Sequence, residues 1–181
     1  DNFKTYTTQE SADASWVSDN TTYSRVNITN YNIDFNGNGS PTRDIYHSLG
    51  FTASDTAWVF RFKIRFSTYT MGVGYGQCWF GLTSSPTGGY ASTQDGISIR
   101  FCRDNVLKIT YGDATGIEIN LSSNITPDFA INTDYYVELK RTSATNVTLT
   151  TFANDPTFTT STATGSFTIA STVTGLNSIV L

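Results

Sequence analysis

Hydrophobic and polar side chains alternate without interruption over residues 58–66, Trp-Val-Phe-Arg-Phe-Lys-Ile-Arg-Phe. A period of two is typical of a β-strand, because successive side chains point to opposite faces of the sheet. The large hydrophobic residues therefore face a core, whereas the opposite face carries the cations Arg61, Lys63 and Arg65. That polar face must meet water, carboxylates or a polar ligand.

Shorter alternating runs recur along the chain between stretches rich in Gly, Asn, Asp and Pro, which is typical of strands joined by turns. The predicted strands cover residues 3–6, 24–28, 32–35, 45–49, 57–66, 76–82, 96–101, 106–111, 116–121, 135–142, 146–152, 165–169 and 178–181. At most one short helix is expected, near residues 8–14, where Thr7 and Glu10 have the spacing of a capping box. Residues 157–164 are predicted to form a loop or an exposed edge strand.

These strands predict an all-β protein in which two antiparallel sheets pack face to face as a β-sandwich. Thirteen short strands are more than one open sheet usually carries, so two packed sheets are the simplest arrangement. We expect residues 5–6 and 179–181 to form terminal strands that lie side by side.

Length, composition and net charge limit the classes of protein to which the chain can belong. The chain has 181 residues, which suits a single domain over residues 1–181, and we interpret it as the mature or excised part of a larger extracellular protein. Charged residues make up 14% of the chain against a typical level of about 25%. The net charge of −4 argues against nucleic acid as a partner. No apolar run is long enough to insert into a membrane.

The two cysteines fall in neighbouring predicted strands. If residues 76–83 and 96–103 pair antiparallel about a centre near Tyr90, Cys78 lies opposite Cys102, and a disulfide is geometrically allowed. The same register predicts the pairs Trp79–Phe101 and Phe80–Arg100, with Phe80, Arg100 and both cysteines on one face. The alternative is two small buried thiols.

Several strand sequences resemble those of concanavalin A-like lectin/glucanase (laminin-G-like) jelly-roll domains. The residues that carry the resemblance are Asp1-Asn2-Phe3, 12–17, 25–28, 55–63, 79–82, 135–142 and 173–176. The resemblance implies a jelly roll of the kind found in large extracellular microbial proteins and in phage particle proteins. Such domains are usually taken for carbohydrate-binding or adhesive units, and they often hold one structural Ca²⁺.

No catalytic pattern is evident. Glucanases of this superfamily carry a Glu-x-Asp-x-x-Glu strand, and the three glutamates, Glu10, Glu118 and Glu138, do not have that spacing. The single histidine, His47, lies within an alternating segment and is expected to be a strand residue without a catalytic role. We therefore expect no enzymatic activity.

Candidate metal ligands are turn aspartates. The resemblance implies Asp1 as a ligand, and Asp34 and Asp155 lie in or near predicted turns, where carbonyl oxygens can complete a Ca²⁺ site. The alternative is that turn aspartates bond their own backbone.

Sugar binding needs aromatic faces and planar hydrogen-bonding groups. The loop or outward-facing tyrosines are Tyr69, Tyr75, Tyr90, Tyr111 and Tyr136. The predicted ligand-binding residues are Tyr75, Tyr90, Tyr111, Arg61 and Arg100. The alternative for the cations is that they pair with Glu138, Glu118 or aspartates.

The predicted function is a non-catalytic carbohydrate-binding or adhesion module that recognises a polysaccharide or a cell-surface glycan. The predicted location is extracellular, on a cell surface or on a virion surface. One alternative is a structural subunit or decoration domain that self-assembles or joins its parent protein through edge strands, with residues 178–181 as the added strand. A glycoside hydrolase is the least favoured alternative.

Overall fold

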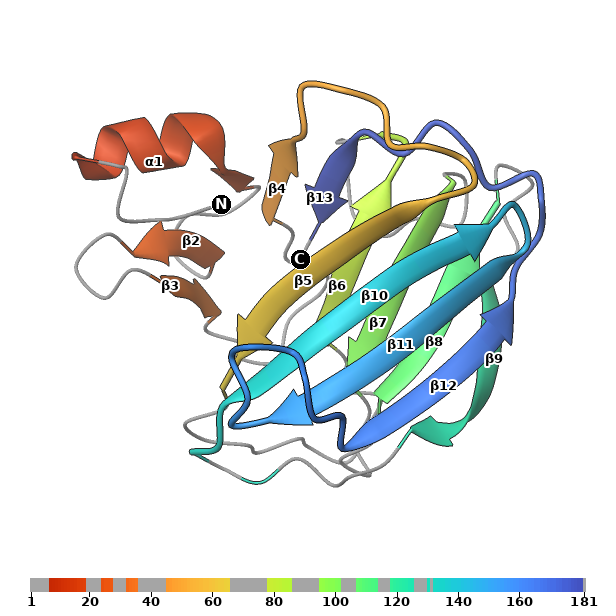
Figure 1. The fold of residues 1–181 in the computed structure, drawn as a ribbon. Helices are drawn as coiled ribbons and strands as arrows, with labels where there is room; N and C mark the ends of the chain where they lie inside the picture. Colours follow the sequence, from red (N-terminus) through yellow and green to blue (C-terminus); the bar gives the residue numbers. More distant parts are fainter. Residues whose placement is uncertain are drawn as a thin grey trace, which may run out of the picture.

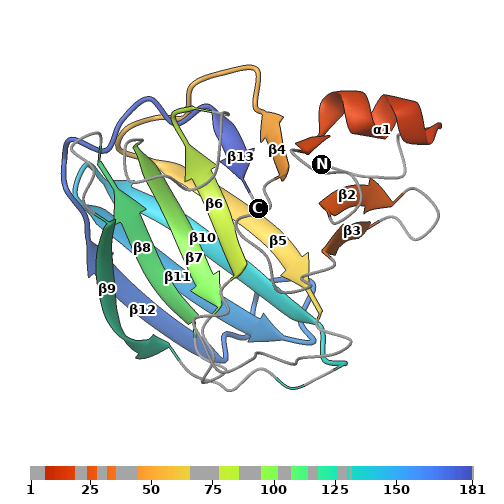
Figure 2. The same cartoon turned by 180° about the vertical axis from the view of Figure 1, so that it is seen from behind.

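The computed structural model describes residues 7–18, 24–27, 32–35, 45–65, 78–85, 95–101, 107–113, 118–125, 130 and 132–180. Two antiparallel sheets lie face to face (Figures 1 and 2), as the sequence predicts for a β-sandwich. Every described strand pair is antiparallel.

The larger sheet has seven strands, in the order β1-β4-β13-β6-β7-β8-β9. Their bounds are β1 Val17–Ser18, β4 Ile45–Ser48, β13 Ser178–Val180, β6 Cys78–Thr83, β7 Gly96–Phe101, β8 Leu107–Gly112 and β9 Glu118–Ile125. The smaller sheet has four strands, in the order β12-β11-β10-β5. Their bounds are β12 Ala163–Thr168, β11 Asn146–Ala153, β10 Tyr135–Ser143 and β5 Trp58–Ile64.

A small N-terminal group of elements lies beside β4 rather than within the sandwich (Figure 1). It consists of the helix α1 (Gln9–Ser15) and the paired strands β2 (Ser24–Asn27) and β3 (Asn32–Phe35). The expected short helix is confirmed, but its cap is one residue later than predicted. Thr8 is the N-cap: its hydroxyl accepts from the amide of Ser11, and its own amide donates to the Ser11 hydroxyl. This pair takes the place of the predicted Thr7 and Glu10.

The core lies between the sheets and follows the alternation in the sequence. In β10, Val137 and Leu139 are fully buried, and in β7 so are Ile97 and Ile99. Across the gap, Phe62 of β5 meets Phe80 of β6 with ring centroids 4.0 Å apart. The predicted orientation of the run 58–66 is confirmed for its described part, because the burial of β5 alternates residue by residue.

The predicted register between β6 and β7 is wrong by one residue. Cys78 pairs with Phe101, Trp79 with Arg100, Phe80 with Ile99 and Leu82 with Ile97. A one-residue shift reverses the face of every side chain, so Phe80 pairs with a core isoleucine and not with Arg100. Cys102 lies outside the described residues, so the disulfide with Cys78 stays a prediction. The strand register from which that disulfide was inferred is not the observed one.

The last described strand is internal to its sheet. β13 pairs with β4 on one side and with β6 on the other, so the proposal that residues 178–181 add to a neighbouring molecule is wrong. The expected partner of this strand, residues 5–6, lies outside the described residues. Among the described strands, the outermost of the two sheets are β1, β9, β12 and β5.

The segment that leads into β13 is held by polar contacts from both sheets. The buried Arg141 of β10 donates to the carbonyl of Val173 at 2.8 Å. Asp95, which precedes β7, accepts from the amide of Thr174 at 2.9 Å, and Asp55 accepts from the amide of Gly175 at 3.1 Å. These contacts fix the position at which β13 enters the sheet. No helix in the described part of the chain has the length and apolarity to cross a membrane.

Candidate functional site

The outer face of the four-stranded sheet carries a group of described polar side chains. We call it the polar face and define it by Arg61, Lys63, Tyr136, Glu138, Thr150 and Thr164. These residues project outward because the intervening positions of each strand, such as Val137 and Leu149, are fully buried in the core.

An ion pair joins two strands at the centre of this face. Nε and Nη2 of Arg61 on β5 both contact the Oε2 atom of Glu138 on β10, at 2.7 and 2.6 Å. The Arg61 side chain is 54% exposed and that of Glu138 17% exposed, so the pair contributes at most about 1 kcal/mol to stability. Among the described residues, nothing bonds to Oε1 of Glu138 or to Nη1 of Arg61. The pair therefore presents an acceptor and a donor to solvent.

The other two cations of the run 58–66 are paired as well. Lys63 lies 2.7 Å from Oδ2 of Asp134, and Arg65 lies 3.8 Å from Oδ1 of the same carboxylate. The alternative interpretation of these cations, that they pair with Glu138, Glu118 or aspartates, is confirmed for all three.

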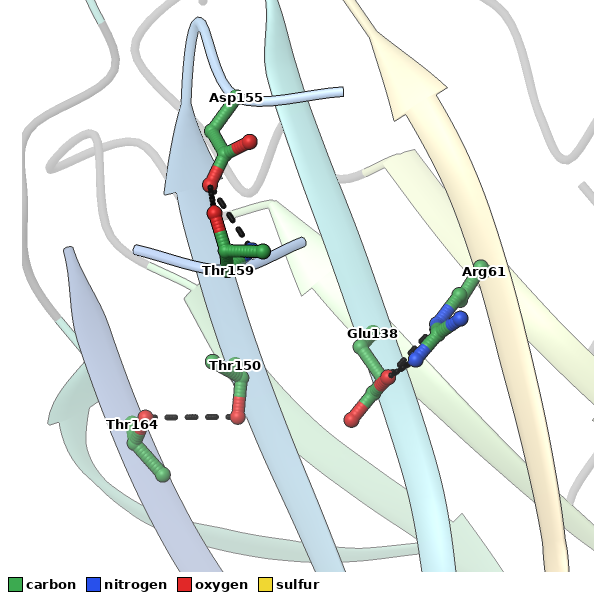
Figure 3. A network of polar contacts seen from close by, with 6 residues as sticks. All are labelled: Arg61, Glu138, Thr150, Asp155, Thr159 and Thr164. Atoms are coloured by element: carbon green, nitrogen blue, oxygen red, sulfur yellow. Dashed lines mark hydrogen bonds and ion pairs between the residues drawn. The ribbon is translucent and has the colours of Figure 1, made fainter. Parts of the chain in front are cut away.

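Two threonines continue the row that begins with the ion pair. Thr150 of β11 is the cross-strand partner of Glu138, and Thr164 of β12 is the partner of Thr150. The Thr164 hydroxyl donates to Thr150 Oγ1 at 3.3 Å. Figure 3 shows these two threonines, Glu138 and Arg61 lying in sequence across the sheet. One line of side chains thus crosses all four strands.

Aromatic rings close one end of the polar face. Phe158, in the loop between β11 and β12, lies edge-on to Phe152 and to Tyr136, with ring centroids 5.2 and 5.8 Å apart. The Arg61 guanidinium lies over the Phe158 ring, 4.8 Å from its centroid. Because Phe158 covers it, Phe152 is only 6% exposed although it points away from the core. The loop that carries Phe158 thus packs beside the Arg61–Glu138 ion pair.

Asp155 holds that loop in shape. Its carboxylate accepts from the amide and the hydroxyl of Thr157, from the amide and the hydroxyl of Thr159, and from the amide of Thr160. These bonds, led by that from the Thr157 hydroxyl, hold the pKa of Asp155 well below its ordinary value. They fix the turn in which Phe158 takes a positive φ of 57°.

The lowered pKa predicts that this loop tolerates acid. The contribution of Asp155 to stability is complete above the pKa of the unfolded chain, near 3.9, and is lost only as the pH falls through the lower folded pKa. We expect the amide NMR signals of Thr159 and Thr160 to stay unshifted down to about pH 3, where ordinary aspartates are already protonated. Asp155→Asn is the control, since it removes the titrating group. A transition in both amides centred near 3.9 in the wild type would contradict the prediction.

The structure gathers few of the predicted binding residues. Arg61 lies on the polar face, but Tyr111 was expected to point outward and is instead 7% exposed within the core cluster. It belongs to the inner face of β8, where it alternates with Lys108 and Thr110. Tyr69, Tyr75 and Tyr90 lie outside the described residues. Arg100 lies in β7 opposite Trp79, and its side chain is not among those described.

The predicted metal ligands do not come together in the described part of the chain. Asp1 lies outside it, and Asp34 is placed only by its backbone, in β3 opposite Arg25. Both oxygens of Asp155 bond its own loop, which is the alternative considered from the sequence. The described residues contain no group of three or more His, Cys, Asp or Glu arranged to hold a metal ion. Calcium binding therefore stays a prediction.

His47 makes contacts that hold α1 and β4 together. It lies in strand β4, as predicted, and its ring stacks on Trp16 with centroids 4.8 Å apart. Nδ1 is 2.8 Å from the carbonyl oxygen of Ser15 and donates to it, since a carbonyl only accepts.

Sequence reasoning missed Thr150, Thr164 and Phe158. The two threonines carry a usable signal, because polar residues alternate with buried ones along residues 147–151 and at the start of β12. Phe158 carries none: it stands in a Thr-rich loop, and its contacts depend on how that loop turns back over the sheet.

Comparisons with known proteins assign no family to the chain. No protein-family model matches the chain. No curated protein matches it either. Among solved structures, the carbohydrate recognition domain of Emp46p in its metal-free form is similar, with a TM-score of 0.49 and 13% sequence identity. That match covers 99% of this chain and 94% of the other. We transfer no residue role from a likeness of this size.

Proposed function

We propose that this chain is a non-catalytic carbohydrate-binding or adhesion module of an extracellular, cell-surface or virion-surface protein. The observation that supports this function is the Arg61–Glu138 pair, which keeps an acceptor and a donor available beside threonine hydroxyls and aromatic rings. Sugar hydroxyls both donate and accept, and sugar C–H groups pack on aromatic rings, so this set of groups matches a glycan.

The positions of the glutamates support binding rather than hydrolysis. Glu10 lies in α1, Glu118 in β9 and Glu138 in β10, so no two of them share an element or a sheet. A retaining glycosidase needs two carboxyl groups about 5 Å apart across the scissile bond. The described partner of Glu138 is a cation instead of a second carboxylate.

A glycan-array screen tests this function directly. The purified domain is applied once with Ca²⁺ and once with a chelator, and we expect at least one class of glycan to bind above background. Loss of binding on chelation would make Ca²⁺ part of the recognition site, whereas binding in both buffers would limit any Ca²⁺ to a structural role. The absence of binding in both buffers would contradict the proposed function.

A further inference from the structure

We propose, on the basis of the proposed function, that the polar face takes a neutral oligosaccharide along the row Thr164–Thr150–Glu138–Arg61, with two adjacent sugar hydroxyls held by Glu138 and Arg61. The ligand class is therefore an uncharged glycan chain with a free vicinal diol.

The geometry of the ion pair carries the diol contact. Because Nε and Nη2 of Arg61 both meet Oε2 of Glu138, the second carboxylate oxygen and the second terminal nitrogen have no described partner. One hydroxyl of a vicinal diol can donate to Oε1 while its neighbour accepts from Nη1. Hydrogen bonds to charged groups are the stronger ones, which makes this pair the anchor of the site.

The threonines extend the site beyond a single sugar. Strands lie about 4.8 Å apart, so a row across four strands spans roughly 14 Å, which exceeds the width of one sugar ring. Thr164 donates its hydroxyl hydrogen to Thr150, and the hydroxyl hydrogen of Thr150 has no acceptor among the described residues. Thr150 can therefore donate to a sugar oxygen next to the diol, and an oligosaccharide can use the whole row.

The charges of the face favour a neutral ligand. Arg61 is paired with Glu138, and Lys63 and Arg65 are paired with Asp134. A sugar carboxylate placed over the row would meet Oε1 of Glu138 and would compete with bonds that the cations already make. Lys140 has no described carboxylate partner, but it lies outside the row that binds the ligand, in the neighbouring row opposite Val59 and Thr148.

The site is held in shape before any ligand arrives. The Arg61 guanidinium packs on the ring of Phe158, and the Asp155 hydrogen bonds fix the conformation of the loop that carries Phe158. Pre-organised groups lose less conformational freedom when a ligand binds, which favours affinity.

Isothermal titration calorimetry with defined probes tests the inference. The neutral probes are cellohexaose, laminarihexaose and mannohexaose, and the acidic probe is hexagalacturonate. We expect one neutral probe to bind, Glu138→Ala to weaken its binding by roughly tenfold or more, and Thr150→Val to weaken it several-fold. Thr148→Val is the matched control, since it makes the same change on the same strand and face one row away, and it should leave the affinity unchanged.

A second variant tests whether the negative charge of Glu138 disfavours an acidic ligand. Glu138→Gln removes the negative charge while keeping the shape of the side chain, so we expect it to strengthen binding of hexagalacturonate relative to the wild type. Urea unfolding shows that each variant still folds, and we expect the loss of stability to stay at or below about 1 kcal/mol, because the Arg61–Glu138 pair contributes no more than that.

The outcomes separate the inference from the proposed function. Glycan binding that is unchanged in Glu138→Ala and Thr150→Val, or that is confined to the acidic probe, would overturn the inference and leave the carbohydrate-binding function standing. If no glycan binds here or on the array, the proposed function fails and the inference fails with it.

Discussion

Replacing Arg141 by methionine is expected to lower the free energy of unfolding by about 3 kcal/mol, because a buried carbonyl loses its donor. Arg141 is 1% exposed and donates to the carbonyls of Val173 at 2.8 Å, Ala144 at 2.7 Å and Ser143 at 3.2 Å. Methionine keeps most of the stem contacts but has no donor. The carbonyl of Val173 lies in the buried part of this network, where water cannot easily replace the guanidinium.

Two opposing effects decide the size of this loss. Burial lowers the pKa of the Arg141 guanidinium, and the negative charge of Asp55 partly offsets that shift. Methionine removes a charge that is costly to bury, which by itself favours the variant. The three carbonyls remain, however. The buried carbonyl of Val173 alone costs about 1–3 kcal/mol when it loses its donor, and the two part-buried carbonyls add to that loss, so the net effect is destabilising.

Urea unfolding and calorimetry measure the effect of Arg141→Met. For a chain of this size, a loss of 3 kcal/mol corresponds to a fall in Tm of roughly 6–12 °C. Lys140→Met is the matched control, since it makes a similar change on the adjacent, exposed residue of the same strand and should change stability by less than about 0.5 kcal/mol. Equal unfolding midpoints for Arg141→Met and Lys140→Met would contradict the structural role of Arg141.

Gly81→Ala is expected to cost about 3 kcal/mol through a clash in the middle of the seven-stranded sheet. A Cβ at Gly81 would overlap the carbonyl oxygen of Ile97 and would lie 2.5 Å from Cα of Ser98. Both contacts are backbone atoms of β7. Gly81 is also paired with Val180 of β13 on its other side, so β6 cannot shift away without breaking a second ladder.

The buried side chains around Ser98 leave β7 little room to move away from a Cβ at Gly81. Ser98 is fully buried and its hydroxyl is 3.0 Å from that of Thr110, which is also fully buried. Equilibrium unfolding of Gly81→Ala provides the measurement. Gly50→Ala is the control, because Gly50 has a positive φ of 73° but open space around it, so it should cost only about 1–2 kcal/mol. A smaller loss for Gly81→Ala than for Gly50→Ala would exclude the proposed clash.

The register of β6 and β7 could have been read from the sequence. The observed pairs, Phe80 with Ile99 and Leu82 with Ile97, match hydrophobic residues across the strands. The predicted register would have placed Phe80 opposite Arg100 and Leu82 opposite Ser98. Cross-strand pairs share one face of a sheet, so hydrophobic matching is a better guide to register than the alignment of two cysteines.

The sequence by itself determined the class of fold and most of the described strands. It did not predict β1, and the predicted strand at residues 3–6 lies outside the described residues. The alternation at β5, β10 and β11 reports which side chains meet the core, and that period is a local property of each strand. The same alternation put Arg61 and Glu138 on polar faces before their partners were known. Single elements, including the helix at Gln9–Ser15, were therefore predictable within a few residues.

Only the tertiary structure decided which of these faces meet and what they form. Arg61 and Glu138 are 77 residues apart in the chain, and they pair because β5 and β10 are neighbours in the sheet. Phe158 reaches Arg61 because the Asp155 hydrogen bonds turn the loop back over β11. Arg141, in contrast, alternates with the polar positions of β10 and is buried because its carbonyl partners come from the adjoining turn and from the segment near Val173. Strand order and loop conformation set these contacts, and neither leaves a periodic trace in the local sequence.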